Sequence, residues 1–208
     1  MILQDLHLGS LAAESDDELF NYFVVTPIAE TIVLRDIGLV LGRKGSGKTA
    51  LFRQMEELLS RQKLDHVNVI RLNMDDYAWA AFSSFRDLGL SDEHAATVAW
   101  QLAILLQIAV GVANANVAWT NQSAPHVDVL RTFVSDNFSE AQPSLETTAS
   151  LFGQFSSLQV GAFGVAFEAN FETGTPAFQL VPALTNVISQ HLVEPLTESA
   201  WLLILDQL

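Results

Sequence analysis

A glycine-rich loop between an apolar run and an amphipathic segment is the feature that most constrains this fold. Residues 37–41 are IGLVL, residues 42–49 are GRKGSGKT, and apolar side chains recur at helical spacing over residues 51–59. The pattern predicts a buried, parallel strand over 37–42 and a helix over 48–62 that begins inside the loop. A strand, a loop and a helix in immediate succession favour an α/β architecture.

The loop matches the pattern G-x-x-x-x-G-K-[ST] at Gly42, Gly47, Lys48 and Thr49. Glycines allow positive φ angles, so backbone N–H groups can approach phosphate oxygens, and the following helix adds unpaired N–H groups and a favourable dipole. Lys48 is then expected to bridge β- and γ-phosphates as a catalytic residue, and the Thr49 hydroxyl to bind Mg²⁺. The predicted nucleotide-binding residues are Gly42, Arg43, Lys44, Gly45, Ser46, Gly47, Lys48, Thr49 and Ala50.

Basic residues are concentrated around this loop. The net charge is −14, yet eight of the ten lysines and arginines lie within residues 35–71 and none lies within 132–208. Nucleic-acid binding needs basic residues spread over a face, so direct nucleic-acid contact by this segment is disfavoured and a compact anion is favoured. The side chains of Arg43 and Lys44 are expected to be solvated while their backbone N–H groups face the anion. The alternative, a chance match in a basic turn, is disfavoured by the flanking strand and helix.

A second apolar segment ends in an acid. Residues 201–206 are WLLILD, which predicts a buried strand with Asp206 at its carboxyl end. This is the pattern of a Walker B strand, whose acid holds Mg²⁺ through water, and it predicts Asp206 as a catalytic and metal-binding residue beside Thr49. An acid after a buried strand is common, so the assignment depends on the glycine-rich loop.

The rest of the chain completes an α/β plan. Residues 66–73 (HVNVIRLN) alternate as a strand, and with 37–42 and 48–62 they form a βαβ unit. We therefore predict one P-loop NTPase domain over 1–208, with a mostly parallel sheet flanked by helices and a largely helical insertion over 77–157. The expected helices are 10–23, 77–88, 92–116, 126–137, 145–157 and 180–193, with Pro27 as a breaker and period-two alternation over 158–172 predicting a hairpin or an extra strand.

Composition excludes several other kinds of site. The chain has no cysteine, which excludes disulfides, thiolate ligands and a cysteine nucleophile. Its five histidines have no metal-ligand spacing, so each is expected to be a surface or capping histidine. Residues 94–127 carry no Asp, Glu, Lys or Arg, but Gln101, Gln107, Asn114 and Asn116 interrupt the apolar run and favour a buried helix over a membrane span. The N-terminus has no basic or long apolar segment, which favours a cytoplasmic location.

The sequence does not identify the residue that would activate water for hydrolysis. A glutamate often follows the Walker B aspartate, but Gln207 follows Asp206 here and the sequence stops at Leu208. We expect the sequence to be the N-terminal part of a longer protein.

With these motifs the chain resembles, over most of its length and specifically at residues 9–53 and 201–208, a group of large bacterial P-loop ATPases related to the KAP and STAND-like ATPases. Their pattern combines G-x-x-x-A-E-x-D, then Tyr-Phe, then G-R-K-G-S-G-K-[ST]-A. The corresponding residues are Gly9, Ala13, Glu14, Asp16, Tyr22, Phe23 and Gly42–Ala50. The resemblance implies ATP and Mg²⁺ as ligands, and some members are linked to phage defence or DNA transactions. In that group the Walker B strand often continues as L-D-x-L-D, of which LDQL at 205–208 would be the first part.

Three functions remain open from the sequence. The first is a Mg²⁺-dependent ATPase that drives a switch or an assembly, acting as a homo-oligomer or with a protein partner. The second is a nucleotide-binding interaction module with little hydrolysis. The third, a small-molecule kinase, is less favoured because such enzymes close an arginine-rich lid on the phosphates, and residues 132–208 contain no arginine.

Overall fold

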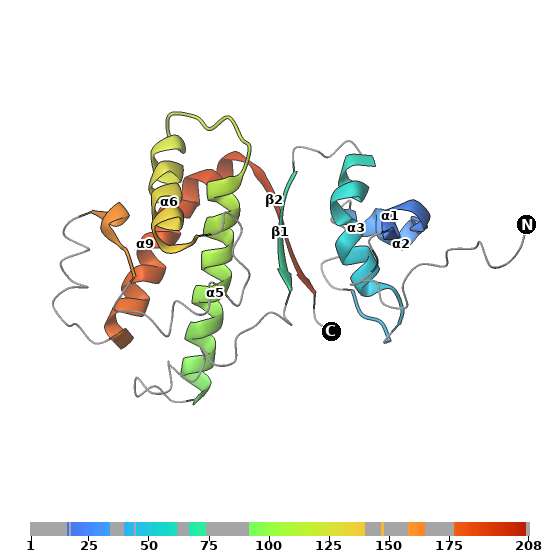
Figure 1. Cartoon of the computed structure of the whole chain (residues 1–208), viewed down its shortest axis with the longest axis horizontal. Helices are drawn as coiled ribbons and strands as arrows, with labels where there is room; N and C mark the ends of the chain where they lie inside the picture. The colour runs from blue at the N-terminus through green and yellow to red at the C-terminus, as the bar shows by residue number, and fades with distance from the viewer. Residues whose placement is uncertain are drawn as a thin grey trace, which may run out of the picture. The chain divides into compact units, whose positions relative to one another are not determined.

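The computed structural model divides the chain into two compact units, Met1–Val67 and Asn68–Gln207. It describes residues 16, 18–33, 40–43, 45–61, 67–73, 92–139, 147, 158–164 and 177–206. The described elements are α1 (Leu19–Tyr22), α2 (Pro27–Val33), α3 (Lys48–Arg61), β1 (Val67–Asn73), α5 (Asp92–Asn114), α6 (Ala124–Asn137), the 3₁₀ turn η5 (Gly161–Phe163), α9 (Ala177–Glu198) and β2 (Ala200–Asp206) (Figure 1).

In the first unit, α3 packs against α2. The apolar residues Met55, Leu58 and Leu59 of α3 are buried, which confirms the helix predicted from their spacing. Pro27 was expected to break structure, but it begins α2. Proline suits the first helical position because its missing N–H would have no partner there, and the Thr26 hydroxyl accepts a hydrogen bond from the N–H of Ala29 at 3.3 Å.

The described residues of the predicted helix 10–23 are helical only over Leu19–Tyr22. Asp16 lies before this helix, and its Oδ1 accepts a hydrogen bond from the N–H of Glu18 at 3.1 Å. An aspartate that binds the backbone two residues ahead favours a turn over a continuing helix. Residues 10–15 lie outside the described part of the chain.

The strand predicted over 37–42 is not seen in its described residues. Residues 40–43 have no regular structure, and Leu41 is 83% exposed. A strand needs a neighbour for its N–H and C=O groups, and in the described part of the chain the two strands pair with each other. Residues 37–39 lie outside the described ranges, so the prediction is contradicted only at its C-terminal end.

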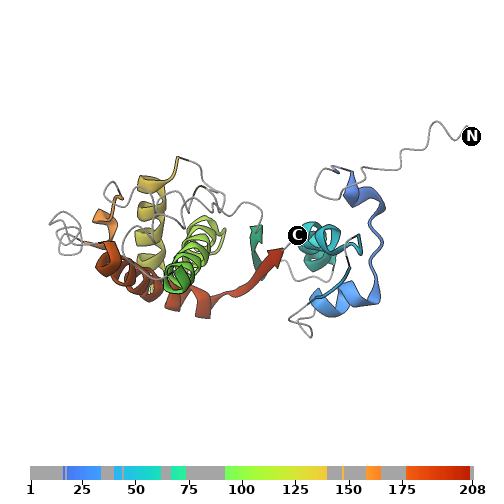
Figure 2. The ribbon, with the colours of Figure 1, turned by 90° about the horizontal axis from the view of Figure 1, so that it is seen from below.

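In the second unit, α5, α6 and α9 pack against one another around one apolar core (Figure 2). Its fully buried side chains include Leu102, Leu106, Leu130, Phe133, Leu184 and Ile188. The helices predicted over 92–116, 126–137 and 180–193 are confirmed, and the last extends at both ends. In the described part of the chain, α5 contains an apolar stretch, Ala96–Asn114, that could cross a membrane by its length and composition, and half of that stretch is buried within the protein.

The strands β1 and β2 form a two-stranded sheet in which both run in the same direction (Figure 1). Both were predicted, over 66–73 and 201–206. The side chain of Asn68 begins the pairing, because its Nδ2 donates to Ser199 Oγ at 2.9 Å and to the carbonyl of Ala200 at 3.3 Å. Parallel strands need a long crossover connection between them, and here that connection contains the three packed helices.

The strand or hairpin predicted over 158–172 is wrong for its described residues. Residues 158–160 have no regular structure and η5 follows. The side chain of Asn137 explains the difference, because it accepts from the N–H of Gln159 at 2.8 Å and donates to its carbonyl at 2.7 Å. These are backbone groups that a neighbouring strand would otherwise bind. Residues 165–172 lie outside the described part.

The described part of the chain is thus mostly helical with one two-stranded parallel sheet. The predicted helix 77–88 lies outside the described residues. Of the predicted helix 145–157 the structure describes Thr147 alone, and that residue is helical. Within the predicted insertion 77–157, α5 and α6 are helical, but their packing partner α9 lies beyond it. The full P-loop sheet stays a prediction.

Candidate functional site

The predicted phosphate loop folds as a tight, exposed turn. Gly45 and Gly47 have φ angles of 80° and 86°, in the region that favours glycine. The N–H of Ser46 donates to the carbonyl of Arg43 at 3.1 Å and closes the turn. A Cβ atom at Gly42 would overlap Ser46 Oγ, so any other residue there would require the Ser46 side chain to rotate.

The Lys48 side chain folds back over this loop. Its Nζ donates to the carbonyl of Gly42 at 2.9 Å and to that of Arg43 at 3.2 Å. Lys48 is also the first residue of α3, and the N–H of Leu51 donates to the carbonyl of Gly47 at 2.9 Å. The N–H groups of Lys48, Thr49 and Ala50 therefore precede the first helical hydrogen bond and have no acceptor within the helix.

These groups form an arrangement suited to a polyanion. The ammonium group, the first N–H groups of α3 and the positive end of the helix dipole all belong to one short segment. Thr49 is half-buried in the first turn of α3 and could contribute its hydroxyl to Mg²⁺. The described residues contain no cluster of three or more His, Asp or Glu that could hold a metal ion.

The described loop residues 42–43 and 45–47 lie in the turn and residues 48–50 begin α3; their role in binding a nucleotide stays a prediction. Lys44 lies outside the described residues. Asp206 is the last residue of β2, at the carboxyl end where it was expected, and it belongs to the second unit; its side chain lies outside the described part. The metal-binding role of Asp206 stays a prediction.

A contact that the sequence did not predict joins α3 to Asp16. Arg53 Nη1 donates to the Asp16 carbonyl at 3.4 Å across 37 positions of sequence. Asp16 is 5% exposed. The one signal available beforehand was the place of Asp16 in the G-x-x-x-A-E-x-D pattern.

A histidine pair in the second unit also escaped prediction. Nδ1 of His126 on α6 lies 3.0 Å from Nδ1 of His191 on α9, a hydrogen-bond distance, and the Phe163 ring lies 5.8 Å from that of His191. The pKa of His191 lies below its ordinary value because burial disfavours the imidazolium and because His126 repels it. Both residues are half-buried, so the expectation of surface or capping histidines is not contradicted, although the contact between them was not predicted.

The histidine pair predicts a pH dependence of stability. A group whose folded-state pKa is lowered takes up its proton more readily when unfolded, so its contribution is present above the ordinary histidine pKa of about 6.5 and is lost as pH falls. We expect the urea midpoint of the His191→Gln variant to fall less than that of the wild type between pH 8 and pH 5.5. Equal pH slopes for the two proteins would contradict this.

A second polar contact joins the loop after α5 to the end of α9. Glu198 accepts hydrogen bonds from the N–H of Thr120 at 2.7 Å and from its hydroxyl at 2.8 Å. The pKa of Glu198 is lowered by hydrogen bonds from Ser123 and Thr120, which favour the carboxylate. Beside this contact, the rings of Trp119 and Trp201 stack with their centroids 6.4 Å apart. This contact joins two segments of the second unit.

Comparison of the chain with protein-family models, with curated proteins and with solved structures finds no match.

Proposed function

We propose that the chain is a Mg²⁺-dependent, ATP-binding P-loop ATPase domain whose nucleotide cycle drives a switch or an assembly. The observation that supports this most is the position of Lys48, whose Nζ lies over the loop carbonyls of Gly42 and Arg43 at the start of α3. In that position an ammonium group can exchange backbone carbonyls for phosphate oxygens without any rearrangement of the helix. Resemblance to bacterial P-loop ATPases suggests phage defence or DNA transactions as the setting.

In this proposal each residue has a limited task. The N–H groups of the loop and of the first turn of α3 bind phosphate oxygens, and Lys48 balances charge between the β- and γ-phosphates. The Thr49 hydroxyl is one Mg²⁺ ligand. Asp206 is assigned as a water-mediated ligand from its place after an apolar strand. Mg²⁺ would neutralise the charge that develops on the phosphates.

Titration calorimetry on the wild-type chain tests the proposal. We expect MgATP to bind with a micromolar dissociation constant, and EDTA to weaken binding because Thr49 and Asp206 act through the metal. MgGTP should bind more weakly, since the sequence lacks the N-K-x-D guanine motif. No detectable binding of MgATP at millimolar concentration would reject a nucleotide site.

The alternative is a nucleotide-binding interaction module that hydrolyses little ATP. Gln207 in place of the usual glutamate favours it, because an amide cannot accept a proton from water. Phosphate release and light scattering separate the two functions. Nucleotide-dependent assembly without phosphate release supports the module, and steady phosphate release supports the ATPase.

A further inference from the structure

We propose that Asp16 and Arg53 are positioning residues that hold α3 in the orientation needed to present the phosphate loop, an inference that rests on the proposed function. Helix α3 carries Lys48, Thr49 and Ala50 in its first turn. Arg53 follows Lys48 by five residues, about 7.5 Å along the helix axis at 1.5 Å per residue. Because the helix is rigid over so short a length, whatever holds Arg53 also sets the position of the phosphate-binding N–H groups.

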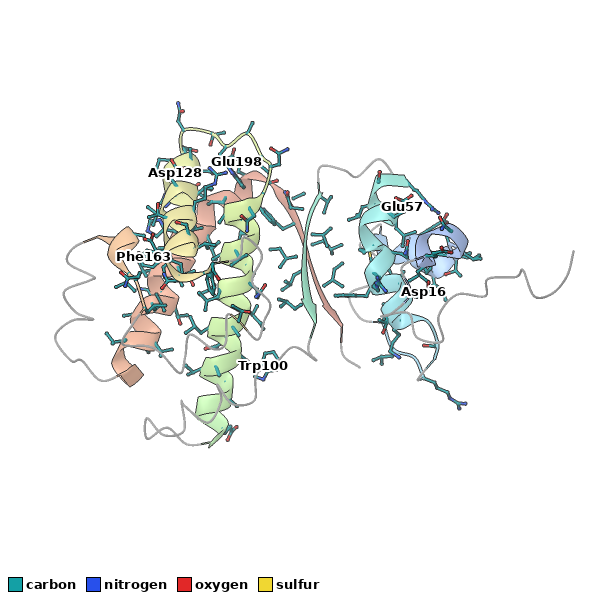
Figure 3. The ribbon with its side chains drawn as sticks, in the orientation of Figure 1. Asp16, Glu57, Trp100, Asp128, Phe163 and Glu198 are labelled. Atoms are coloured by element: carbon teal, nitrogen blue, oxygen red, sulfur yellow. The ribbon has the colours of Figure 1, made fainter. Side chains whose placement is uncertain are left out.

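The contact with Asp16 holds Arg53 from outside its own helix. The half-buried Arg53 guanidinium donates from Nη1 to the Asp16 carbonyl at 3.4 Å, and the same carbonyl accepts from the N–H of Leu19 at 3.4 Å. Asp16 belongs to the turn that begins α1, in the first unit, where Figure 3 labels it. Arg53 thus connects the phosphate-loop helix to the N-terminal turn.

The Asp16 side chain fixes that turn. It is 5% exposed, and its Oδ1 accepts from the N–H of Glu18 at 3.1 Å. Burying a carboxylate is unfavourable unless hydrogen bonds or a nearby cation compensate it. An acid at this position therefore has a specific local task, which is to fix the carbonyl that receives Arg53.

Arg61 on the same helix shows the contrast. Its Nε lies 2.9 Å from Glu57 Oε1, and both side chains are exposed. A pair four residues apart within one helix supports the helix locally but cannot set the position of the helix. Arg61 is therefore a matched control for Arg53, with the same side chain on the same helix.

Titration of the full chain with MgATP tests the inference. We expect Arg53→Gln to weaken binding about tenfold, as the loss of a hydrogen bond from a charged group predicts. Asp16→Ala keeps the carbonyl that accepts from Arg53 but removes the Oδ1 acceptor of the Glu18 N–H that fixes the turn, so it should weaken binding by a similar factor. Arg61→Gln should change it by less than about twofold. Arg53→Lys, which keeps a charged donor, should recover most of the affinity. The double variant Asp16→Ala/Arg53→Gln should bind no more weakly than either single variant, because both act through one contact.

The outcomes separate this inference from the proposed function. Wild-type affinity in Arg53→Gln and Asp16→Ala, beside a loss in Lys48→Ala, overturns the positioning role alone. No loss in Lys48→Ala overturns the nucleotide site itself. Circular dichroism and the urea midpoint establish that each variant is folded; should Arg53→Gln fail to fold, Asp16→Ala decides, and additive losses in the double variant would also count against coupling.

Discussion

Lys48→Ala is expected to weaken MgATP binding about a hundredfold or more while leaving the fold intact. The Nζ atom makes two loop contacts, at 2.9 and 3.2 Å, and both would be exchanged for charge-assisted contacts with phosphate. Each such contact contributes roughly 1.5–3 kcal/mol, so losing two corresponds to about two or more factors of ten in the dissociation constant. Alanine is the strongest helix former, so α3 should keep its first turn.

Arg61→Ala is the control for this change, because it removes one positive charge from the opposite end of the same helix. Arg61 is the last residue of α3 and pairs with Glu57 on the surface. We expect an affinity within about twofold of the wild type, since exposed ion pairs contribute little and distant charges are screened by salt. Equal losses in Lys48→Ala and Arg61→Ala would show that net charge, and not the loop, attracts the nucleotide.

Most of the helices and strands that the structure confirms were predicted from local sequence patterns. Helix α3 and the long helix α5 follow from apolar spacing, and the strands β1 and β2 follow from apolar, β-branched runs. The turn before α3 also follows from local sequence, because its glycines and Lys48 interact over at most six residues, while its role in binding phosphate stays a prediction. Interactions of this range are encoded in a short window of sequence.

Long-range contacts account for two of the differences between prediction and structure. The alternation after residue 158 indicated a strand, but Asn137 binds both backbone groups of Gln159 from another element. His126 and His191 meet across 65 positions, a distance over which spacing rules carry no information. The first contact depends on how α6 packs against the segment that contains η5, and the second on how α6 packs against α9; both are set by the tertiary core.

The candidate site also combines short-range contacts, which local sequence predicts, with long-range contacts, which it does not. The φ angles of Gly45 and Gly47 and the Lys48 contacts involve a short window of sequence, whereas the Arg53 contact with Asp16 depends on the chain folding back over 37 positions. The predicted partnership of Thr49 with Asp206 requires segments more than 150 residues apart, and it stays a prediction. Local sequence can therefore indicate which ligand a loop suits, while the residues that orient the loop emerge only from the structure.

Gly111→Leu is expected to destabilise the second unit by about 3 kcal/mol, the upper part of the range for overpacking a core. Gly111 lies inside α5, where glycine is normally unfavourable by about 1 kcal/mol relative to alanine. Its place is explained by Ile70 of β1, because a Cβ atom at Gly111 would lie 2.8 Å from both Cδ1 and Cγ1 of that side chain. The missing side chain lets the strand lie directly on the helix.

Urea unfolding followed by tryptophan fluorescence measures this effect, because Trp79, Trp100, Trp119 and Trp201 all belong to the second unit. Gln101→Leu, an exposed position on the same helix, introduces the same side chain without the overlap and should change the midpoint little. Ile70→Ala removes the obstructing atoms, so Gly111→Leu should cost less in that background than in the wild type. Independent, additive losses would mean that Gly111 does not limit the approach of β1 to α5.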